Sequence, residues 1–267
     1  LQPQVLRKAG MEYFDNWAGT YGQTVTELEV KPSGSGYHMK TRFSKFHNLP
    51  ELQKQFLQVF DMVQTADLNL TLPRLANGKP ELIVCEKSTD QEIQVEDGLC
   101  RAEAIESGKV NPKDDNMLAV CTYMTKVALD PRIVDANAAD EPCTKVNQCV
   151  AKILENEKKF PDTTQVVFCD TNTPKTDGSF SVYNSLRDKL AESGRFTKEQ
   201  VAFIHEYDSD LKRNKLFAAV NKGEIKVVMG STSKLGTGVN IQTMLKTAHH
   251  LDAPYRPADL EQRNGRT

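Results

Sequence analysis

The sequence of 267 residues predicts an α/β fold, in which a doubly wound parallel sheet is preceded by a β-hairpin and a helical connector. The main observation is that, from residue 164 onward, short apolar runs alternate with longer amphipathic segments. Parallel strands need such crossover helices, which cover both faces of the sheet. The second observation is that residues 1–160 show one hairpin pattern and otherwise mainly helical periodicity.

The N-terminal part begins with residues 1–22, where aromatic residues and glycines predict helix and loop. Residues 24–30 and 37–43 alternate in polarity around a Pro-Ser-Gly-Ser-Gly turn, which predicts a β-hairpin. The second arm carries the basic residues Lys40, Arg42 and Lys45. A solvated strand face explains these cations better than a DNA-binding arm, because exposed strands commonly carry lysine and arginine.

The middle of the chain predicts helices. An apolar stripe from Leu52 to Val63 predicts a helix that ends near Thr65, and turn residues then lead to a β-like segment at 81–86. Ser88 and Gln91 have the spacing of a capping box. From these signals we expect helices at 88–107, 114–129 and from Thr144 to Pro161.

The C-terminal part predicts the sheet itself. We expect strands at 164–169, 201–204, 225–229 and 248–251, and helices at 179–193, at 209–221 and from Pro257. Ligands of such sheets bind beyond the carboxyl ends of the strands. The polar residues expected at those ends are Asp170, His205, Ser231, Thr232 and Asp252.

Composition excludes several classes of protein. A net charge of -2 leaves no overall basic character, so any nucleic-acid contact must be a local patch. The six cysteines are scattered without a C-x-x-C pair, which indicates reduced thiols and a cytoplasmic protein. No apolar run approaches the ~18 residues of a spanning helix, so we expect no membrane contact. We also expect no metal site at His249 and His250, because neighbouring strand residues point to opposite faces.

The last forty residues hold the most informative motifs. A Gly-rich segment, residues 230–240, follows an apolar strand, and glycines there let the backbone approach a phosphate closely. From Pro257, a predicted helix carries polar residues at three- and four-residue steps, so we expect both of its arginines on one face that meets a triphosphate. These polar residues are Asp259, Gln262, Arg263 and Arg266.

Three segments in this order resemble motifs IV, V and VI of the second RecA-like domain of superfamily-two helicases and translocases. They are residues 166–170, 230–240 and 261–266. Gly238-Val239-Asn240 is similar to motif V of the SWI/SNF-like branch, and upstream stretches such as Asn48–Leu52 are similar to bacterial and phage helicases that are often fused to an adenine-specific DNA methylase. The resemblance implies that residues 1–80 form the tail of the first RecA-like domain, 81–160 a helical connector and 161–267 the second RecA-like domain.

The resemblance also implies roles for individual residues. Arg266 would be the catalytic arginine that approaches the γ-phosphate of ATP. Other nucleotide contacts would come from Gly236, Gly238, Gln262 and Arg263. The phosphate backbone of double-stranded DNA would be contacted by Ser231, Thr232 and Lys234. ATP and Mg²⁺ would bind mainly to the first RecA-like domain of the same polypeptide, to which a methylase region could also belong.

Two expectations follow from what the sequence lacks. It has no G-x-x-x-x-G-K-[ST] loop and no Asp-Glu pair at the end of an apolar strand, and it stops at Thr267 within motif VI. We therefore expect a fragment of the motor core that is inactive alone. The alternative is a non-catalytic α/β module that binds RNA or a partner protein; a P-loop encoded upstream would favour the motor.

Overall fold

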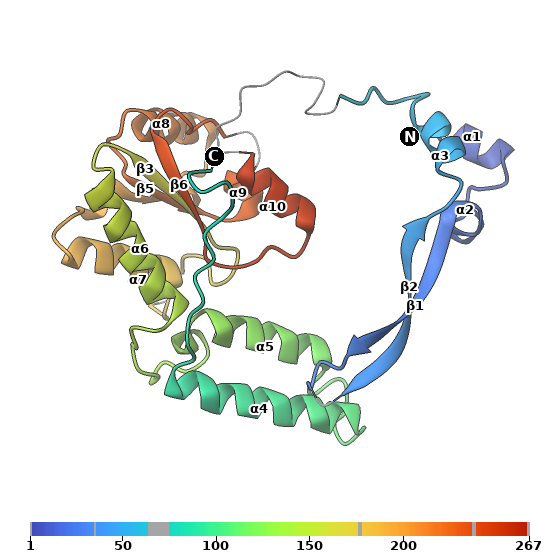
Figure 1. Cartoon of the computed structure of the whole chain (residues 1–267), viewed down its shortest axis with the longest axis horizontal. Helices are drawn as coiled ribbons and strands as arrows, with labels where there is room; N and C mark the ends of the chain where they lie inside the picture. Colours follow the sequence, from blue (N-terminus) through green and yellow to red (C-terminus); the bar gives the residue numbers. More distant parts are fainter. Residues whose placement is uncertain (1, 35, 64–74, 176–177, 237–238, 266–267) are drawn as a thin grey trace. The chain divides into compact units, whose positions relative to one another are not determined.

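The computed structural model describes residues 2–34, 36–63, 75–175, 178–236 and 239–265 (Figure 1). The chain divides into two compact units, Leu1–Lys79 and Pro80–Thr267, which are described separately. Within the described residues, every helix is too short or too polar to cross a membrane.

In its described residues, the first unit is a β-hairpin with three short helices. Its elements are α1 (Pro3–Lys8), α2 (Phe14–Tyr21), β1 (Gly22–Val30), β2 (Tyr37–Phe46) and α3 (Leu49–Phe56). β1 and β2 pair antiparallel, which confirms the predicted hairpin. Aromatic rings of α2 contact rings at the end of β2; for example, the centroids of Trp17 and Phe46 are 6.1 Å apart.

The helix expected to continue to Thr65 is shorter than predicted, since α3 ends at Phe56. Residues of the apolar stripe beyond this point, such as Val59 and Val63, are exposed. A short helix gains most of its stability from packing its apolar face, so a stripe that buries nothing within the unit does not prolong it.

The second unit begins with an extended segment and a helical pair, α4 (Thr89–Glu106) and α5 (Met117–Leu129). The predicted capping box is present, because the Ser88 Oγ accepts from the Gln91 amide at 3.2 Å and the Gln91 side chain accepts from the Ser88 amide at 3.0 Å. The prediction of a β-like segment at 81–86 was wrong. Leu82 and Val84 are exposed, and a single extended segment without a partner strand forms no ladder.

The remaining residues form the predicted parallel sheet. Its strands lie in the order β4-β5-β3-β6, and every pair is parallel. The strands are β3 (Thr164–Phe168), β4 (Val201–Phe203), β5 (Val227–Gly230) and β6 (Leu245–His250). The helices are α6 (Lys145–Lys159), α7 (Val182–Glu192), α8 (Asp210–Asn221), α9 (Thr232–Leu235) and α10 (Pro257–Asn264).

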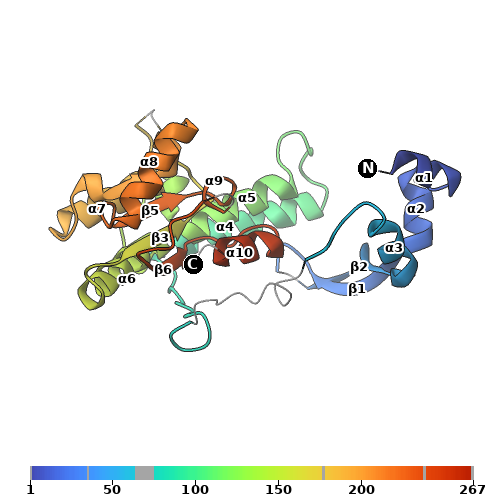
Figure 2. The ribbon, with the colours of Figure 1, turned by 90° about the horizontal axis from the view of Figure 1, so that it is seen from above.

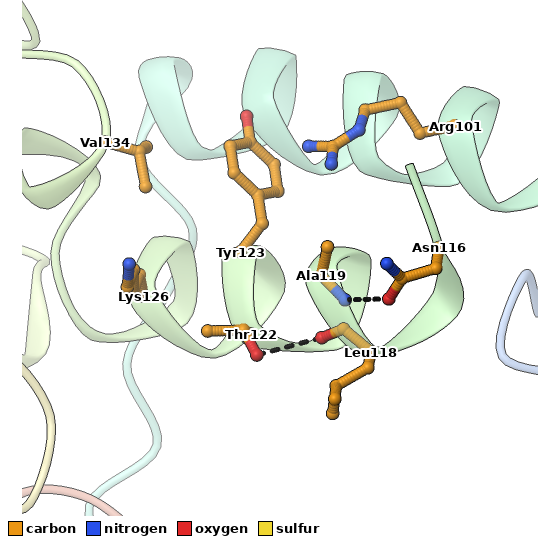
Figure 3. A pocket seen from close by; sticks show the side chains of 8 residues that line it. All are labelled: Arg101, Asn116, Leu118, Ala119, Thr122, Tyr123, Lys126 and Val134. Carbon is orange, nitrogen blue, oxygen red and sulfur yellow. Dashed lines mark hydrogen bonds between the residues drawn. The ribbon is translucent and has the colours of Figure 1, made fainter. Parts of the chain in front are cut away.

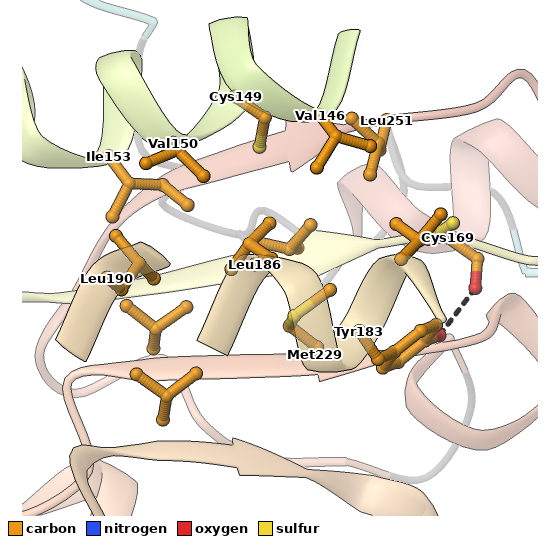
Figure 4. Close-up of a cluster of buried hydrophobic side chains, with 14 of the residues drawn as sticks. Val146, Cys149, Val150, Ile153, Cys169, Tyr183, Leu186, Leu190, Met229 and Leu251 are labelled. Carbon is orange, nitrogen blue, oxygen red and sulfur yellow. Dashed lines mark hydrogen bonds between the residues drawn. The ribbon is translucent and has the colours of Figure 1, made fainter. Parts of the chain in front are cut away.

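Helices cover both faces of this sheet, as the predicted α/β class requires (Figures 1 and 2). α6 and α7 pack on one face, where Ile153 and Leu186 belong to one apolar cluster with the strand residue Met229 (Figure 4). α8 packs on the other face, against neighbouring strand residues such as Val166. α6 lies within the segment expected as a connector, but its apolar stripe is part of the core of the sheet domain.

A candidate functional site at the carboxyl edge of the sheet

The carboxyl edge of the sheet is organised around the buried side chain of Arg263 on α10. This side chain is 0% exposed, and its guanidinium lies over the ring of Phe168. Its Nε donates to the Thr232 Oγ1 at 2.8 Å, and its Nη1 donates to the Asp252 carbonyl oxygen at 2.8 Å. Its Nη2 donates to the Asp170 Oδ2 at 2.7 Å and to the Asp252 Oδ1 at 3.2 Å. We refer to Arg263, Asp170, Thr232 and Asp252 as the Arg263 cluster.

Asp170 joins the end of β3 to the first turn of α9. The amide of Thr232 donates to its Oδ1 and the hydroxyl of Thr232 donates to its Oδ2, both at 2.6 Å. Because the same hydroxyl accepts from Arg263, it is used both as donor and as acceptor. Burial raises the pKa of Asp170, but hydrogen bonds from Thr232 and the charge of Arg263 outweigh it, so that the pKa lies below its ordinary value.

Asp252 joins the ends of the two neighbouring strands β3 and β6. Its Oδ2 accepts from the amides of Asp170 and Thr171, both at 2.7 Å. The buried cation of Arg263 therefore faces two carboxylates that also bind backbone amides, which is the arrangement that makes a buried ion pair tolerable.

The expected DNA-contacting residues lie on and just before the short helix α9, and one of them, Thr232, belongs to the Arg263 cluster. Ser231 and Thr232 are buried, whereas Lys234 is exposed. Ser233 was not singled out from the sequence, yet it is exposed and its Oγ lies 3.1 Å from the Ser231 Oγ. The run of three hydroxyl residues, Ser231-Thr232-Ser233, was the sequence signal that could have pointed to Ser233. The sequence alone does not tell which of the three hydroxyls faces solvent.

The structure also gives physical roles to the glycines around α9. A Cβ at Gly236 would collide with the carbonyl oxygen of Thr232, one turn earlier. A Cβ at Gly230 would lie 2.5 Å from carbons of Ile204 and Leu235. Both glycines therefore permit close packing within the chain. Gly238 lies outside the described residues.

Arg263 was expected on the nucleotide-facing side of α10, and the structure places its side chain inside the domain. The side chain of Arg263 is fully buried and hydrogen-bonded inside the domain, so it does not present its guanidinium to solvent in this structure. Gln262, on the same helix, is exposed, so its side chain is accessible to a ligand. Arg266, the predicted catalytic arginine, lies outside the described residues.

The carboxylates at this edge are a poor fit to Mg²⁺. Asp170 and Asp252 accept from Arg263, from Thr232 and from backbone amides, so their oxygens are already used. Among the described residues there is no group of three histidine, cysteine or acidic side chains placed to hold a metal.

Three histidines near the edge, His205, His249 and His250, have a pKa below the ordinary value, in each case mainly because of burial. Burial, followed by the charge of Lys234, lowers the pKa of His205 at the end of β4. Burial lowers the pKa of His249 on β6 to about 4, and its Nε2 lies 2.9 Å from the Gln165 Oε1. The neighbouring His250 is exposed, in agreement with the expectation that the two rings point to opposite faces.

A hollow of about 510 Å³ lies on the helical pair α4 and α5 (Figure 3). It is lined by Arg101, Tyr123 and Lys126 among others. Arg101 pairs with Asp115 at 2.8 Å and its guanidinium lies over the ring of Tyr123. These contacts hold α4 and α5 together.

The parallel sheet, with the helices α9 and α10 in contact at its carboxyl edge, has the fold of a RecA-like α/β domain. Residues 145–267 match the family model of the helicase conserved C-terminal domain. This part of the chain is thus similar to the C-terminal RecA-like domain of superfamily-two helicases, which suggests a role in a helicase motor core. The match begins at the first residue of α6. No curated protein matches the chain.

Proposed function

We propose that this chain is the C-terminal part of the motor core of an ATP-dependent DNA translocase or helicase of the SWI/SNF-like branch. In this proposal it contacts the backbone of double-stranded DNA through the segment 231–236. It completes an ATP site on the first RecA-like domain through the motif VI helix, with Arg266 as the catalytic arginine.

One observation carries the proposal: residues assigned to two different ligands meet at one edge of the sheet. Lys234 stands on α9, Gln262 stands on α10, and these two helices are in contact. An edge at the carboxyl ends of parallel strands is where ligands of such sheets bind. A motor needs its polynucleotide and nucleotide contacts mechanically connected, and the hydrogen bond from Arg263 to Thr232 joins the two helices that carry Gln262 and Lys234.

The chemistry available to the chain's own residues is simple. Lys234 can neutralise one phosphate of the DNA backbone, and the Ser233 hydroxyl can donate a hydrogen bond to it. Such contacts carry no information about base sequence. ATP, when bound, supplies the free energy of hydrolysis. The exposed Gln262 side chain can orient its phosphates, and Arg266 would stabilise charge in the transition state.

Duplex binding by the 267-residue chain tests the proposal. Fluorescence anisotropy with two labelled duplexes of unrelated sequence, titrated over a range of salt concentrations, should give equal affinities for both. The slope of log affinity against log salt should be shallow, at about one unit per phosphate neutralised. Lys234→Ala should lower that slope by about one unit.

Lys158→Ala is the matched control, because this exposed lysine lies at the end of α6, away from the carboxyl edge. We expect it to leave the slope unchanged. Strong discrimination between the two duplexes, or preferential binding of RNA, would contradict the DNA-motor proposal and favour the binding module.

A further inference from the structure

We propose that Arg263 is a positioning residue that fixes the segment 231–236, so that Ser233 and Lys234 present their donors to a DNA phosphate. This inference rests on the proposed function, and it assigns to Arg263 an indirect role in DNA binding. It differs from the nucleotide contact that the motif resemblance implies for this residue.

The burial of Arg263 excludes a direct contact with DNA in this structure. Its side chain is 0% exposed, and its Nε, Nη1 and Nη2 all donate within the domain. Any effect of this residue on a ligand must therefore act through its partners. Of these, Thr232 is the one that belongs to the DNA-contacting segment.

The helix α9 depends on such partners for its position. It has only four residues, and a single isolated turn is unstable because nucleation of a helix is unfavourable. Two anchors hold it. Leu235 is fully buried against the sheet, and Thr232 is bound by Asp170 and Arg263.

These anchors determine which side chains face outward. Successive residues of a helix point about 100° apart. When residues 232 and 235 of this single helical turn face the domain, the two residues between them face solvent. Ser233 and Lys234 are the exposed residues of α9. Without the anchor at Thr232, α9 would retain Leu235 as its main contact, and the direction of Lys234 would no longer be fixed.

The test measures duplex binding and its salt dependence for Arg263→Lys, which keeps the charge but loses the planar fork. If Arg263 positions Lys234, duplex binding at low salt should become about tenfold weaker, the size expected for losing one or two hydrogen bonds. The salt slope should fall by about one unit, as it does for Lys234→Ala. Far-UV circular dichroism and denaturant unfolding should establish that the measurements are made on folded protein.

Arg132→Lys is the matched control for the loss of a buried arginine fork. Arg132 also pairs with two carboxylates, those of Asp130 at 2.8 Å and Asp140 at 2.9 Å, and it also lies over a phenylalanine ring. These partners of Arg132 all lie outside α9. We expect this variant to lose stability while its salt slope stays at the wild-type value.

Asp170→Asn provides a second test that does not depend on Arg263→Lys folding. Removing a negative charge that is 38% exposed should strengthen DNA binding if only electrostatics matters. Positioning predicts the opposite, because the amide nitrogen of asparagine cannot accept from Thr232 and Arg263. We expect binding about three- to tenfold weaker and no further loss when Asp170→Asn and Arg263→Lys are combined.

The outcomes separate the two proposals. If Lys234→Ala leaves binding unchanged, the proposed function fails. If Lys234→Ala lowers the slope but folded Arg263→Lys keeps it, or if Asp170→Asn binds DNA more tightly, the positioning role of Arg263 is refuted and the cluster only stabilises the fold.

Discussion

Replacement of Arg263 by methionine should destabilise the second unit substantially. The substitution keeps an apolar side chain of similar length but removes the cation that faces Asp170 and Asp252. Removing one partner of a buried ion pair typically costs about 3–5 kcal/mol of unfolding free energy, because the other partner is left uncompensated. Asp252 is only 8% exposed, but Asp170 is 38% exposed and can be hydrated. We therefore expect a loss of about 3 kcal/mol, at the lower end of that range.

For a unit of this size, such a loss corresponds to a decrease in Tm of about 6–12 °C. The assay must report on the correct unit. The single tryptophan is Trp17, in the first unit, so its fluorescence does not follow unfolding of the sheet. Far-UV circular dichroism or calorimetry, with urea titration to obtain the free energy, is suitable.

Glu261→Ala on the same helix is the control, because Glu261 is exposed; we expect its effect to stay within about 0.5 kcal/mol. A loss of less than about 1 kcal/mol for Arg263→Met would refute the reasoning. It would mean that the two carboxylates are adequately solvated without the guanidinium.

Further predictions concern pH, packing and catalysis. The pKa of His249 falls from 6.5 to about 4 on folding, so the unfolded chain binds more protons than the folded chain between these two pH values. The free energy of unfolding should therefore drop by on the order of 2–3 kcal/mol as the pH is lowered from 6.5 to 4. In a series of urea titrations at different pH, His249→Asn should show a smaller drop over this range. The pKa of Asp170 is lowered on folding, so its contribution is present above 3.8 and is lost at lower pH; an Asp170→Asn variant that lost stability as steeply as wild type below 3.8 would contradict this. Gly230→Ala should cost about 1–3 kcal/mol, measured by urea unfolding, because the added Cβ overlaps Ile204 and Leu235; a neutral effect would show that this packing is loose. The 267-residue chain should release no phosphate from ATP with or without DNA, since it has no P-loop sequence, and DNA-stimulated turnover by a clean preparation would overturn that expectation. In a protein that includes the first RecA-like domain, Arg266→Ala should lower DNA-stimulated ATP hydrolysis by about a thousandfold, and activity within a few-fold of wild type would exclude an arginine finger.

Local signals in the sequence were sufficient for most elements of the fold. Apolar runs such as 164–169 predicted the buried strands, because parallel strands covered on both faces need side chains that are apolar on both sides. Ser88 and Thr144 marked helix starts correctly, because N-cap hydrogen bonds involve only residues two or three positions away. The alternation of these elements then determined the α/β class.

Contacts between distant segments were decided only by the tertiary structure. The strand order places β3 beside β6, and this brings Asp170 next to Asp252, 82 positions further along the chain. Spacing along α10 put Arg263 on a polar helix but gave no information about what that helix faces. The environment of a side chain depends on which elements pack against it, so Arg263 could be recognised as a motif residue from the sequence, whereas its burial among two carboxylates and a threonine follows from the fold alone.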